Sequence, residues 1–224
     1  EVRSFILNYS VVSRISGIGD FRNNKPPKKV NNNILMILAS FPRYYYTGRS
    51  APQGPAFANY LLNLSDLYKY LNEAARTRIS CRSYTYEYGW NDKRYLKKNG
   101  YNFNSGRRKK LNNMMKKNAL NIFTYNSTAI LEAFAYNFIS CCYWDPKQWS
   151  WRKEAQEDLK MLEMAGIYHS NIESLAIFLN KHKTSESLIL WWSSKTVQNA
   201  KNKFCSKYAK SRNNEIKYWS KLLI

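Results

Sequence analysis

The segment from residue 120 to 145 constrains the fold most, because it reads as strand, polar turn, buried helix and strand. Leu120 to Thr124 is a short apolar run, and Phe138 to Tyr143 is another. Residues 129–136 are apolar on nearly every face, with Glu132 as the exception, and such a helix has to be buried. Continuous apolar strands separated by a buried helix predict a parallel sheet with helices on both faces.

The turn in this segment, Tyr125-Asn126-Ser127-Thr128, connects the first strand to the helix. Asn126 or Ser127 is a natural N-cap, and the first helical turn contains no acidic side chain. The helix start therefore keeps its positive end, roughly half a charge, and free backbone N–H groups that suit a phosphate. The alternative is an ordinary cap without a ligand. We expect the phosphate contacts to come from Thr124, Asn126, Ser127 and Thr128.

The rest of the chain predicts one Rossmann-like α/β domain over residues 34–224, preceded by a linker or trailing piece of another domain over residues 1–33. Pro, Gly and Asn gather before residue 34, which is typical of a linker. Strands are expected at residues 34–40 and 78–84, a loop at 99–106, and helices from Gly54-Pro55, over 151–165, after a capping box at 170–173, and over 195–211 and 214–223.

The charge balance invites a second interpretation. The 224 residues include 36 Lys and Arg against 15 Asp and Glu, a net charge of +21. A basic module that binds nucleic acid or an anionic membrane is therefore an alternative function. The basic residues are scattered, the denser run at 107–110 suits a solvated helix face, and the chain carries no RNA-binding signature. At 44% hydrophobic residues the chain is not a disordered polycation.

Cysteine and histidine usage argues against a metal centre. The four cysteines show no C-x-x-C spacing, which favours buried, reduced thiols of a cytoplasmic protein. A histidine-rich site is excluded because the chain has only His169 and His182, and we expect His169 to be structural. No apolar run is long enough for a membrane span. The chain begins at Glu1 in mid-pattern, so we expect a fragment or a processed product.

Five groups of residues, taken together, resemble the transferases of bacterial surface-carbohydrate and O-antigen gene regions. They span roughly residues 34–210 and are Arg82-Ser83-Tyr84 with Tyr88-Gly89-Trp90, Thr124 to Thr128 with Leu131-Glu132-Ala133, Tyr143-Trp144 with Trp149 and Arg152, Leu162 with Gly166-Ile167, and Trp191-Trp192 with Val197-Gln198. Those enzymes are similar to two-domain GT-B transferases, related in outline to the glycerophosphotransferases of teichoic-acid synthesis.

The resemblance implies that this chain is the C-terminal, donor-binding half of such an enzyme. It implies a nucleotide-activated sugar or alcohol as donor, a glycan or lipid-linked acceptor, no cofactor or bound metal, and a place in the cytoplasm or at the inner face of the membrane. The N-terminal half, which in such enzymes binds the acceptor and usually supplies the base, is missing. The resemblance therefore implies an inactive transferase domain when this chain is alone.

Further site candidates come from the residue types. The Arg82 guanidinium, near a strand end, can bind two phosphate oxygens at once, or it can cover an aromatic neighbour. Glu132 can accept hydrogen bonds from a ribose or sugar hydroxyl, or pair with a cation. The remaining candidates are expected to line a cleft, with a solvated loop or the core as their alternatives, and are Arg43, Arg49, Trp90 and Trp144.

Overall fold

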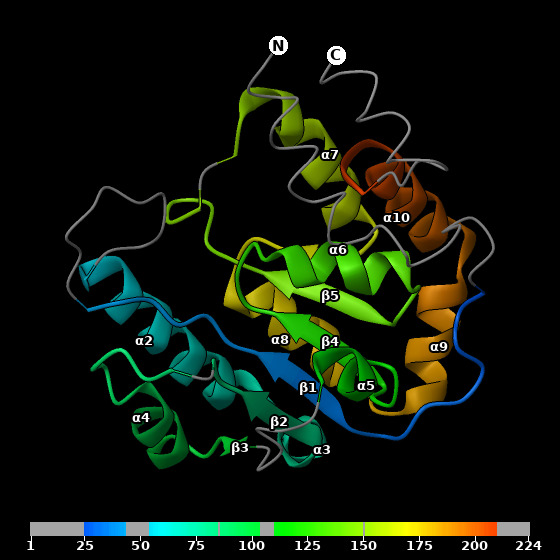
Figure 1. Cartoon of the computed structure of the whole chain (residues 1–224). Helices are drawn as coiled ribbons and strands as arrows, with labels where there is room; N and C mark the ends of the chain where they lie inside the picture. The colour runs from blue at the N-terminus through cyan, green and yellow to red at the C-terminus, as the bar shows by residue number, and fades with distance from the viewer. Residues whose placement is uncertain (1–24, 44–53, 85, 104–109, 150, 210–224) are drawn as a thin grey trace.

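The chain folds around a six-stranded parallel sheet in the order β3-β2-β1-β4-β5-β6 (Figure 1). The computed structural model describes residues 25–43, 54–84, 86–103, 110–149 and 151–209. All five strand pairs are parallel, which confirms the expected Rossmann-like α/β fold. The strands are β1 (Ile34–Ile37), β2 (Ile79–Arg82), β3 (Asn102–Phe103), β4 (Leu120–Phe123), β5 (Ser140–Tyr143) and β6 (Tyr168–His169).

The central strands are buried on both faces, as their unbroken apolar sequences predict. Every residue of β1, β4 and β5 is buried, whereas β2 alternates between buried and half-buried residues. The register places Arg82, Ile37 and Phe123 in one row across β2, β1 and β4. Because neighbouring strands lie about 4.8 Å apart, the Cα atoms of Arg82 and Phe123 are about 10 Å apart, at the same edge of the sheet.

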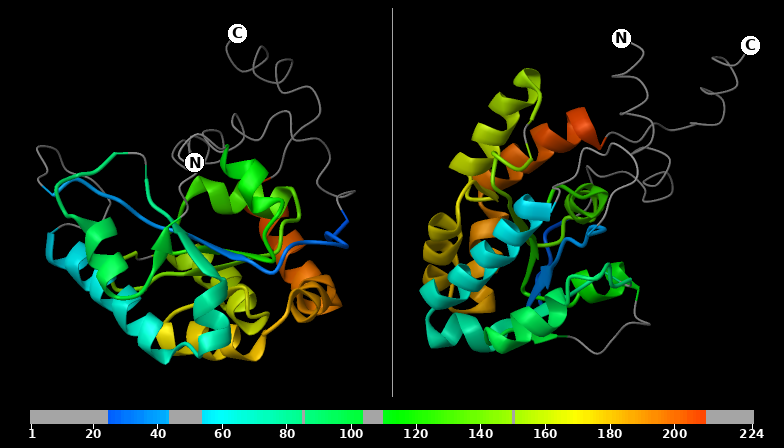
Figure 2. Two further views of the ribbon diagram at one scale, coloured as in Figure 1. Left: turned by 90° about the horizontal axis from the view of Figure 1, so that it is seen from below. Right: turned by 90° about the vertical axis from the view of Figure 1, so that its left-hand side faces the viewer.

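Helices cover both faces of the sheet (Figure 2). The Tyr60 side chain of one helix contacts Thr124 on one face, and Asn121 bonds the carbonyl of Met115 on the other. The helices α2 and α8 cover the first face, and α5 and α6 the second. The bounds are α2 (Gly54–Tyr70), α3 (Glu73–Arg78), α4 (Asp92–Lys98), α5 (Leu111–Met115), α6 (Thr128–Ala135), α7 (Lys153–Met164), α8 (Ile172–Lys181), α9 (Ser185–Ser193) and α10 (Lys195–Tyr208).

Two expectations about local structure were wrong. The loop expected at 99–106 contains β3, a two-residue strand that pairs with β2 at the sheet edge. The cap of α8 is Asn171, whose side chain accepts from the Ser174 N–H, and not Ser170, whose hydroxyl donates to Glu163. The helices α3, α4 and α9 had not been expected, and the helix expected at 214–223 lies outside the described residues.

The last crossover brings α8 back across the sheet onto α2. Asn180 of α8 fixes this contact. Its amide nitrogen donates to the carbonyl of Tyr70, the last residue of α2, and its amide oxygen accepts from the N–H of Asn72, the N-cap of α3. One side chain therefore satisfies backbone groups at the end of one helix and the start of the next.

The strand order reverses direction between β1 and β4. From β1 the chain first extends the sheet through β2 to β3, then returns to the other side of β1 and extends it through β4 to β6. At such a switch point the crossovers on the two sides leave to opposite faces, which opens a crevice beyond the carboxyl ends of the two strands. Open α/β sheets bind their ligands in that crevice.

Candidate functional site

The turn after β4 lies at the switch point, and Thr124 fixes its position there. The Thr124 backbone N–H and hydroxyl both donate to the carbonyl of Ile37 in β1, at 3.1 and 2.9 Å. The same hydroxyl lies 2.6 Å from the Tyr60 phenol, which accepts the N–H of Ala39 at 2.9 Å. Thr124 is fully buried. Its hydroxyl is therefore engaged within the fold, where it fixes the position of the turn.

The hydrogens in this network have one consistent arrangement. Ala39 N–H can only donate, so the Tyr60 oxygen accepts from it. Thr124 donates to the Ile37 carbonyl, which leaves the Tyr60 O–H to donate to Thr124. Burial raises the pKa of Tyr60 far above its ordinary value, and the bonds to Thr124 and Ala39 only partly oppose this. The phenol stays neutral and serves as a structural donor.

The start of α6 is open, as the sequence predicts. Ser127 occupies the N-cap position, but its hydroxyl makes no capping hydrogen bond. The first turn contains no acidic side chain, and within the described part of the chain no group outside the helix accepts from the N–H of Thr128 or Ala129. Asn126 and Thr128 are exposed. These features leave positive charge and free donors at the crevice.

Tyr125 is the first residue of the turn and is half-buried. Burial raises the pKa of its phenol, and the neighbouring Ser127 hydroxyl lowers it by a smaller amount. The Ser127 oxygen itself is buried and makes no hydrogen bond of full geometric quality. The Ser127 hydroxyl thus lies against Tyr125 and does not saturate the helix start.

An aromatic cluster joins the loops that leave four strands at this edge. Phe41 follows β1, and its ring lies 5.8 Å from Phe57 of α2, 6.3 Å from Tyr125 and 6.3 Å from Trp149. Trp90, in the loop after β2, lies 5.0 Å from Phe57, and its N–H donates to the Phe41 carbonyl at 3.1 Å. The exits of β1, β2, β4 and β5 therefore form one packed wall next to the turn.

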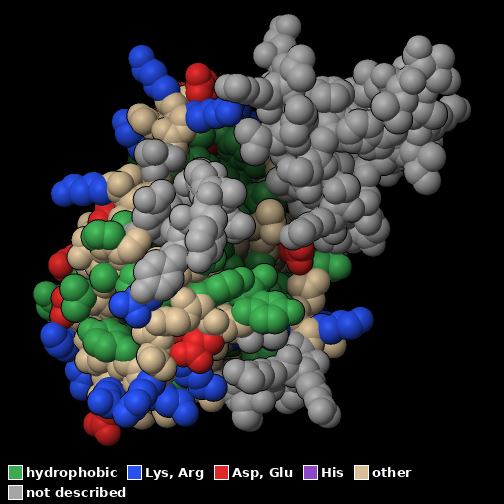
Figure 3. Space-filling view, turned by 60° about the vertical axis from the view of Figure 1, so that its left-hand side comes forward, with side chains coloured by type: hydrophobic (Ala, Val, Ile, Leu, Met, Phe, Trp, Pro, Cys, Tyr) green, Lys and Arg blue, Asp and Glu red, His purple; other side chains and the backbone are tan. Residues whose placement is uncertain are grey.

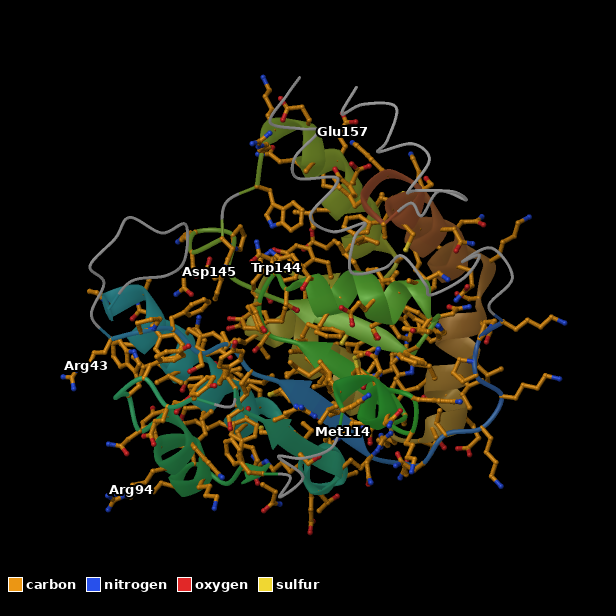
Figure 4. All side chains as sticks on the ribbon, viewed as in Figure 1. Arg43, Arg94, Met114, Trp144, Asp145 and Glu157 are labelled. Carbon is orange, nitrogen blue, oxygen red and sulfur yellow. The ribbon has the colours of Figure 1, made fainter. Side chains whose placement is uncertain are left out.

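The predicted cleft arginines lie at different depths of this edge. The Arg43 guanidinium lies 5.8 Å from the Trp90 ring, and the residue sits at the outer rim (Figure 4). Arg82 ends β2 and is half-buried, with its guanidinium against the sulfur of Met114. Burial lowers the pKa of Arg82. Arg49 lies outside the described residues.

Trp144 follows β5 and is only 2% exposed. Its ring stacks on Trp151 at 5.6 Å and packs against Tyr168 at 4.8 Å. Trp144 is therefore not placed to stack on an exposed base. Trp151 could not be recognised as a candidate from the sequence, because the state of its indole N–H is visible only in the folded chain.

Two further residues lie beyond the turn itself. Glu132 is half-buried in the second turn of α6. His169 ends β6, its Nδ1 lies 2.9 Å from the Ser174 hydroxyl, and burial lowers its pKa to about 4. The neutral imidazole fits the structural role expected for it. In the described ranges no three or more His, Cys, Asp or Glu side chains gather as metal ligands.

Comparison with known proteins identifies the family of this chain. A family model described as LIC12162 family transferase matches residues 12–223, nearly the whole chain. The chain belongs to the LIC12162 transferase family. No curated protein matches it, and no solved structure matches it. The LIC12162 assignment supports the transferase class inferred from the motifs.

A basic surface lies away from the turn, on α4. Arg94, Lys97 and Lys98 are exposed, whereas Asp92, the acid of this helix, is buried at its start. Figure 3 shows Lys and Arg side chains gathered along the lower part of this side of the molecule. No described helix of this LIC12162 family member is both long and apolar enough to cross a bilayer.

Proposed function

We propose that the chain is the donor-binding domain of a transferase that uses a sugar or alcohol activated by a nucleoside diphosphate. The observation that carries the proposal is the open start of α6 at the switch point of the sheet. Two free N–H groups, a helix dipole and no competing carboxylate form a receptor for phosphate oxygens. Arg82, in the same row of the sheet two strands away, supplies a cation within side-chain reach of this turn.

The chemistry follows from the charge on the donor. With a nucleotide sugar, the acceptor hydroxyl oxygen bonds the sugar carbon, the bond from that carbon to the phosphate oxygen breaks, and negative charge develops on the leaving nucleoside diphosphate. With a CDP-alcohol, the acceptor oxygen bonds the phosphorus that carries the alcohol, the phosphoanhydride bond breaks, and the charge develops on the leaving nucleoside monophosphate. The α6 start and Arg82 stabilise that charge. The proton of the acceptor hydroxyl goes to a base on the acceptor side of the cleft, which the resemblance assigns to the N-terminal half of such enzymes.

We also propose the type of enzyme and the process in which it acts. The resemblance of the motifs supports a GT-B-type enzyme of bacterial surface polysaccharide synthesis, with this chain as its C-terminal half. The acceptor is then a glycan or a lipid-linked glycan presented by a second domain, at the cytoplasmic face of the membrane. In this proposal Asn126, Thr128 and Glu132 contact the donor, with Arg43 and Trp90 at the rim.

The deciding experiment measures thermal unfolding with CMP, CDP, UDP and GDP at millimolar concentration. One diphosphate should raise the melting temperature by several degrees, since saturation a hundredfold above the dissociation constant adds about 2.7 kcal/mol. Arg82→Ala should remove the shift, and Arg94→Ala, a cation on the distant α4, should keep it. Unchanged melting with all four nucleotides would rule out the donor site.

The α4 surface favours a second candidate function, contact with a polyanion such as nucleic acid or an anionic membrane. Charge reversal of Arg94, Lys97 and Lys98 should then weaken binding to polyanions and flatten its salt dependence. Equal binding by the reversed variant would show that only diffuse charge is involved.

A further inference from the structure

The indole N–H groups of Trp144 and Trp151 are buried and without a hydrogen-bond partner. Other tryptophans of the described chain use this group. Trp90 donates to the Phe41 carbonyl, Trp191 to the Ala165 carbonyl and Trp192 to Asn137, all within 3.1 Å. Trp144 and Trp151 thus differ from these three tryptophans because their indole nitrogens make no hydrogen bond.

An unpaired buried donor is costly. Leaving such a group without a partner destabilises a protein by about 1–3 kcal/mol, and native structures rarely contain one without a reason. Here two such donors come from rings that stack 5.6 Å apart and within 15° of parallel. The two form one feature, because each ring covers the other.

The pair is held rigidly. The Tyr168 hydroxyl donates to the Trp144 carbonyl at 3.0 Å, and the Tyr168 ring packs on the Trp144 indole. Trp144 therefore cannot turn its N–H toward another acceptor without breaking these contacts. Donors fixed in advance lower the entropy lost on binding.

The pair also lies beside the turn after β4. Phe123 of β4 pairs with Cys142 of β5, so two residues further on the exits of the strands carry Tyr125 and Trp144. Neighbouring parallel strands lie about 4.8 Å apart. Trp144 therefore lies at the strand exit adjacent to the one that leads to the open start of α6.

We propose that the indole N–H groups of Trp144 and Trp151 hydrogen-bond phosphate oxygens of the diphosphate held at the start of α6. The inference rests on the proposed donor-binding function and adds two specific donors to it. Neutral N–H donors suit this place because they bind an anion without adding a buried cation. The diphosphate then meets donors from two neighbouring strand exits at once.

The test uses Trp144→Phe and Trp151→Phe, which remove the N–H and keep an aromatic ring. The probes are inorganic pyrophosphate and the nucleoside diphosphate that protects the wild type. Each variant should bind both probes about tenfold more weakly. The unliganded melting temperature should hold or rise, because an unsatisfied donor has been removed. If Trp144→Phe does not fold, Trp151→Phe carries the test, since its ring is only half-buried.

Trp191→Phe is the matched control. Its N–H is used by the Ala165 carbonyl, so this variant should melt lower and bind the probes with wild-type affinity. Indole resonances of ¹⁵N-labelled wild-type protein give a reading without mutation, since those of Trp144 and Trp151 should move with pyrophosphate while that of Trp191 stays.

The outcomes separate the two proposals. Wild-type binding with unchanged affinity in both tryptophan variants would overturn the inference alone and would assign the two donors to ordered water. A fall in unliganded stability like that of Trp191→Phe would do the same. Failure of the wild type to bind any phosphate probe would overturn the proposed function together with the inference.

Discussion

The Tyr60 phenol and the Thr124 hydroxyl form a 2.6 Å hydrogen bond at the carboxyl edge of the sheet, between a helix on one face and the end of β4. With Ala39 and Ile37 they make a closed chain of donors and acceptors that spans the switch point. These hydrogen bonds fix the strand exit from which the turn at residues 125–128 departs. The geometry of the candidate site thus depends on groups that do not touch a ligand.

Thr124→Val should destabilise the protein by about 1–3 kcal/mol, because the Tyr60 O–H loses its acceptor in a buried place. Nucleotide protection should fall with it, since the turn loses its anchor. Chemical denaturation measures the stability. A double-mutant cycle with Tyr60→Phe should give a coupling near 1 kcal/mol, whereas simple additivity would show that the bond contributes nothing.

Thr128→Glu places a carboxylate in the open first turn of α6. It should raise stability by about 0.3–1 kcal/mol through the helix dipole and abolish protection by nucleotides, because the carboxylate occupies the anion's place. Thr196→Glu is the matched control, since α10 also lacks an acid in its first turn and Thr196 is exposed there. That variant should gain similar stability and keep nucleotide binding, and loss of binding in both would point to a general charge effect.

The central sheet could be predicted because its strands are unbroken apolar runs. Helix α6 could be predicted because a helix that is apolar on nearly every face has to be buried against the sheet. The helices α3 and α4 were not predicted because they are short and polar. Tertiary packing, and not a hydrophobic pattern, determines whether such segments are helical. β3 has two residues and exists only because β2 offers an edge.

The candidate site shows the same division. The open start of α6 is readable from the missing acid in Asn126-Ser127-Thr128-Ala129. That the Thr124 hydroxyl is bound to Ile37, 87 residues earlier, is not readable, because residues so distant meet only through the strand order. The unpaired donors of Trp144 and Trp151 are likewise invisible in sequence, since every tryptophan carries the same N–H.

Gly100→Ala should destabilise strongly, by about 2–4 kcal/mol. The backbone angle φ of +97° disfavours any side chain, and an added Cβ would lie 2.4 Å from the Tyr68 ring, which is itself packed on Tyr101. Gly89→Ala isolates the first effect, because its φ is +82° and nothing lies within 4 Å of an added Cβ. It should lose only about 1 kcal/mol, and equal losses in thermal unfolding would contradict the clash.

Asn137→Gly should lower stability by about 2–4 kcal/mol. The Asn137 amide oxygen accepts from Lys201, Trp192 and Gln198, and burial lowers the pKa of Lys201. Glycine keeps the positive φ of 56° but leaves these donors without that oxygen. Adding Lys201→Met should recover part of the loss, because it removes the buried cation. No recovery in the double variant would show that Lys201 finds another acceptor.

Stability should fall as the pH drops from about 6.5 to about 4. The pKa of His169 is about 4 in the folded protein, below its ordinary value of 6.5, so in this window the unfolded chain binds a proton that the folded one does not. The loss is about 3 kcal/mol in full, at about 1.4 kcal/mol per pKa unit, and is absent above pH 6.5. His169→Gln should flatten the profile measured by denaturation, and an unchanged slope would contradict the assignment.

The two hydrogen bonds by which Asn180 of α8 joins the end of α2 and the start of α3 have a consequence for how the chain folds. The apolar side of α2 finds its covering helix more than a hundred residues later, so a nascent chain exposes that side until α8 has left the ribosome. Domain completion is therefore late during synthesis, and we expect chains interrupted before Lys181 to expose this apolar side.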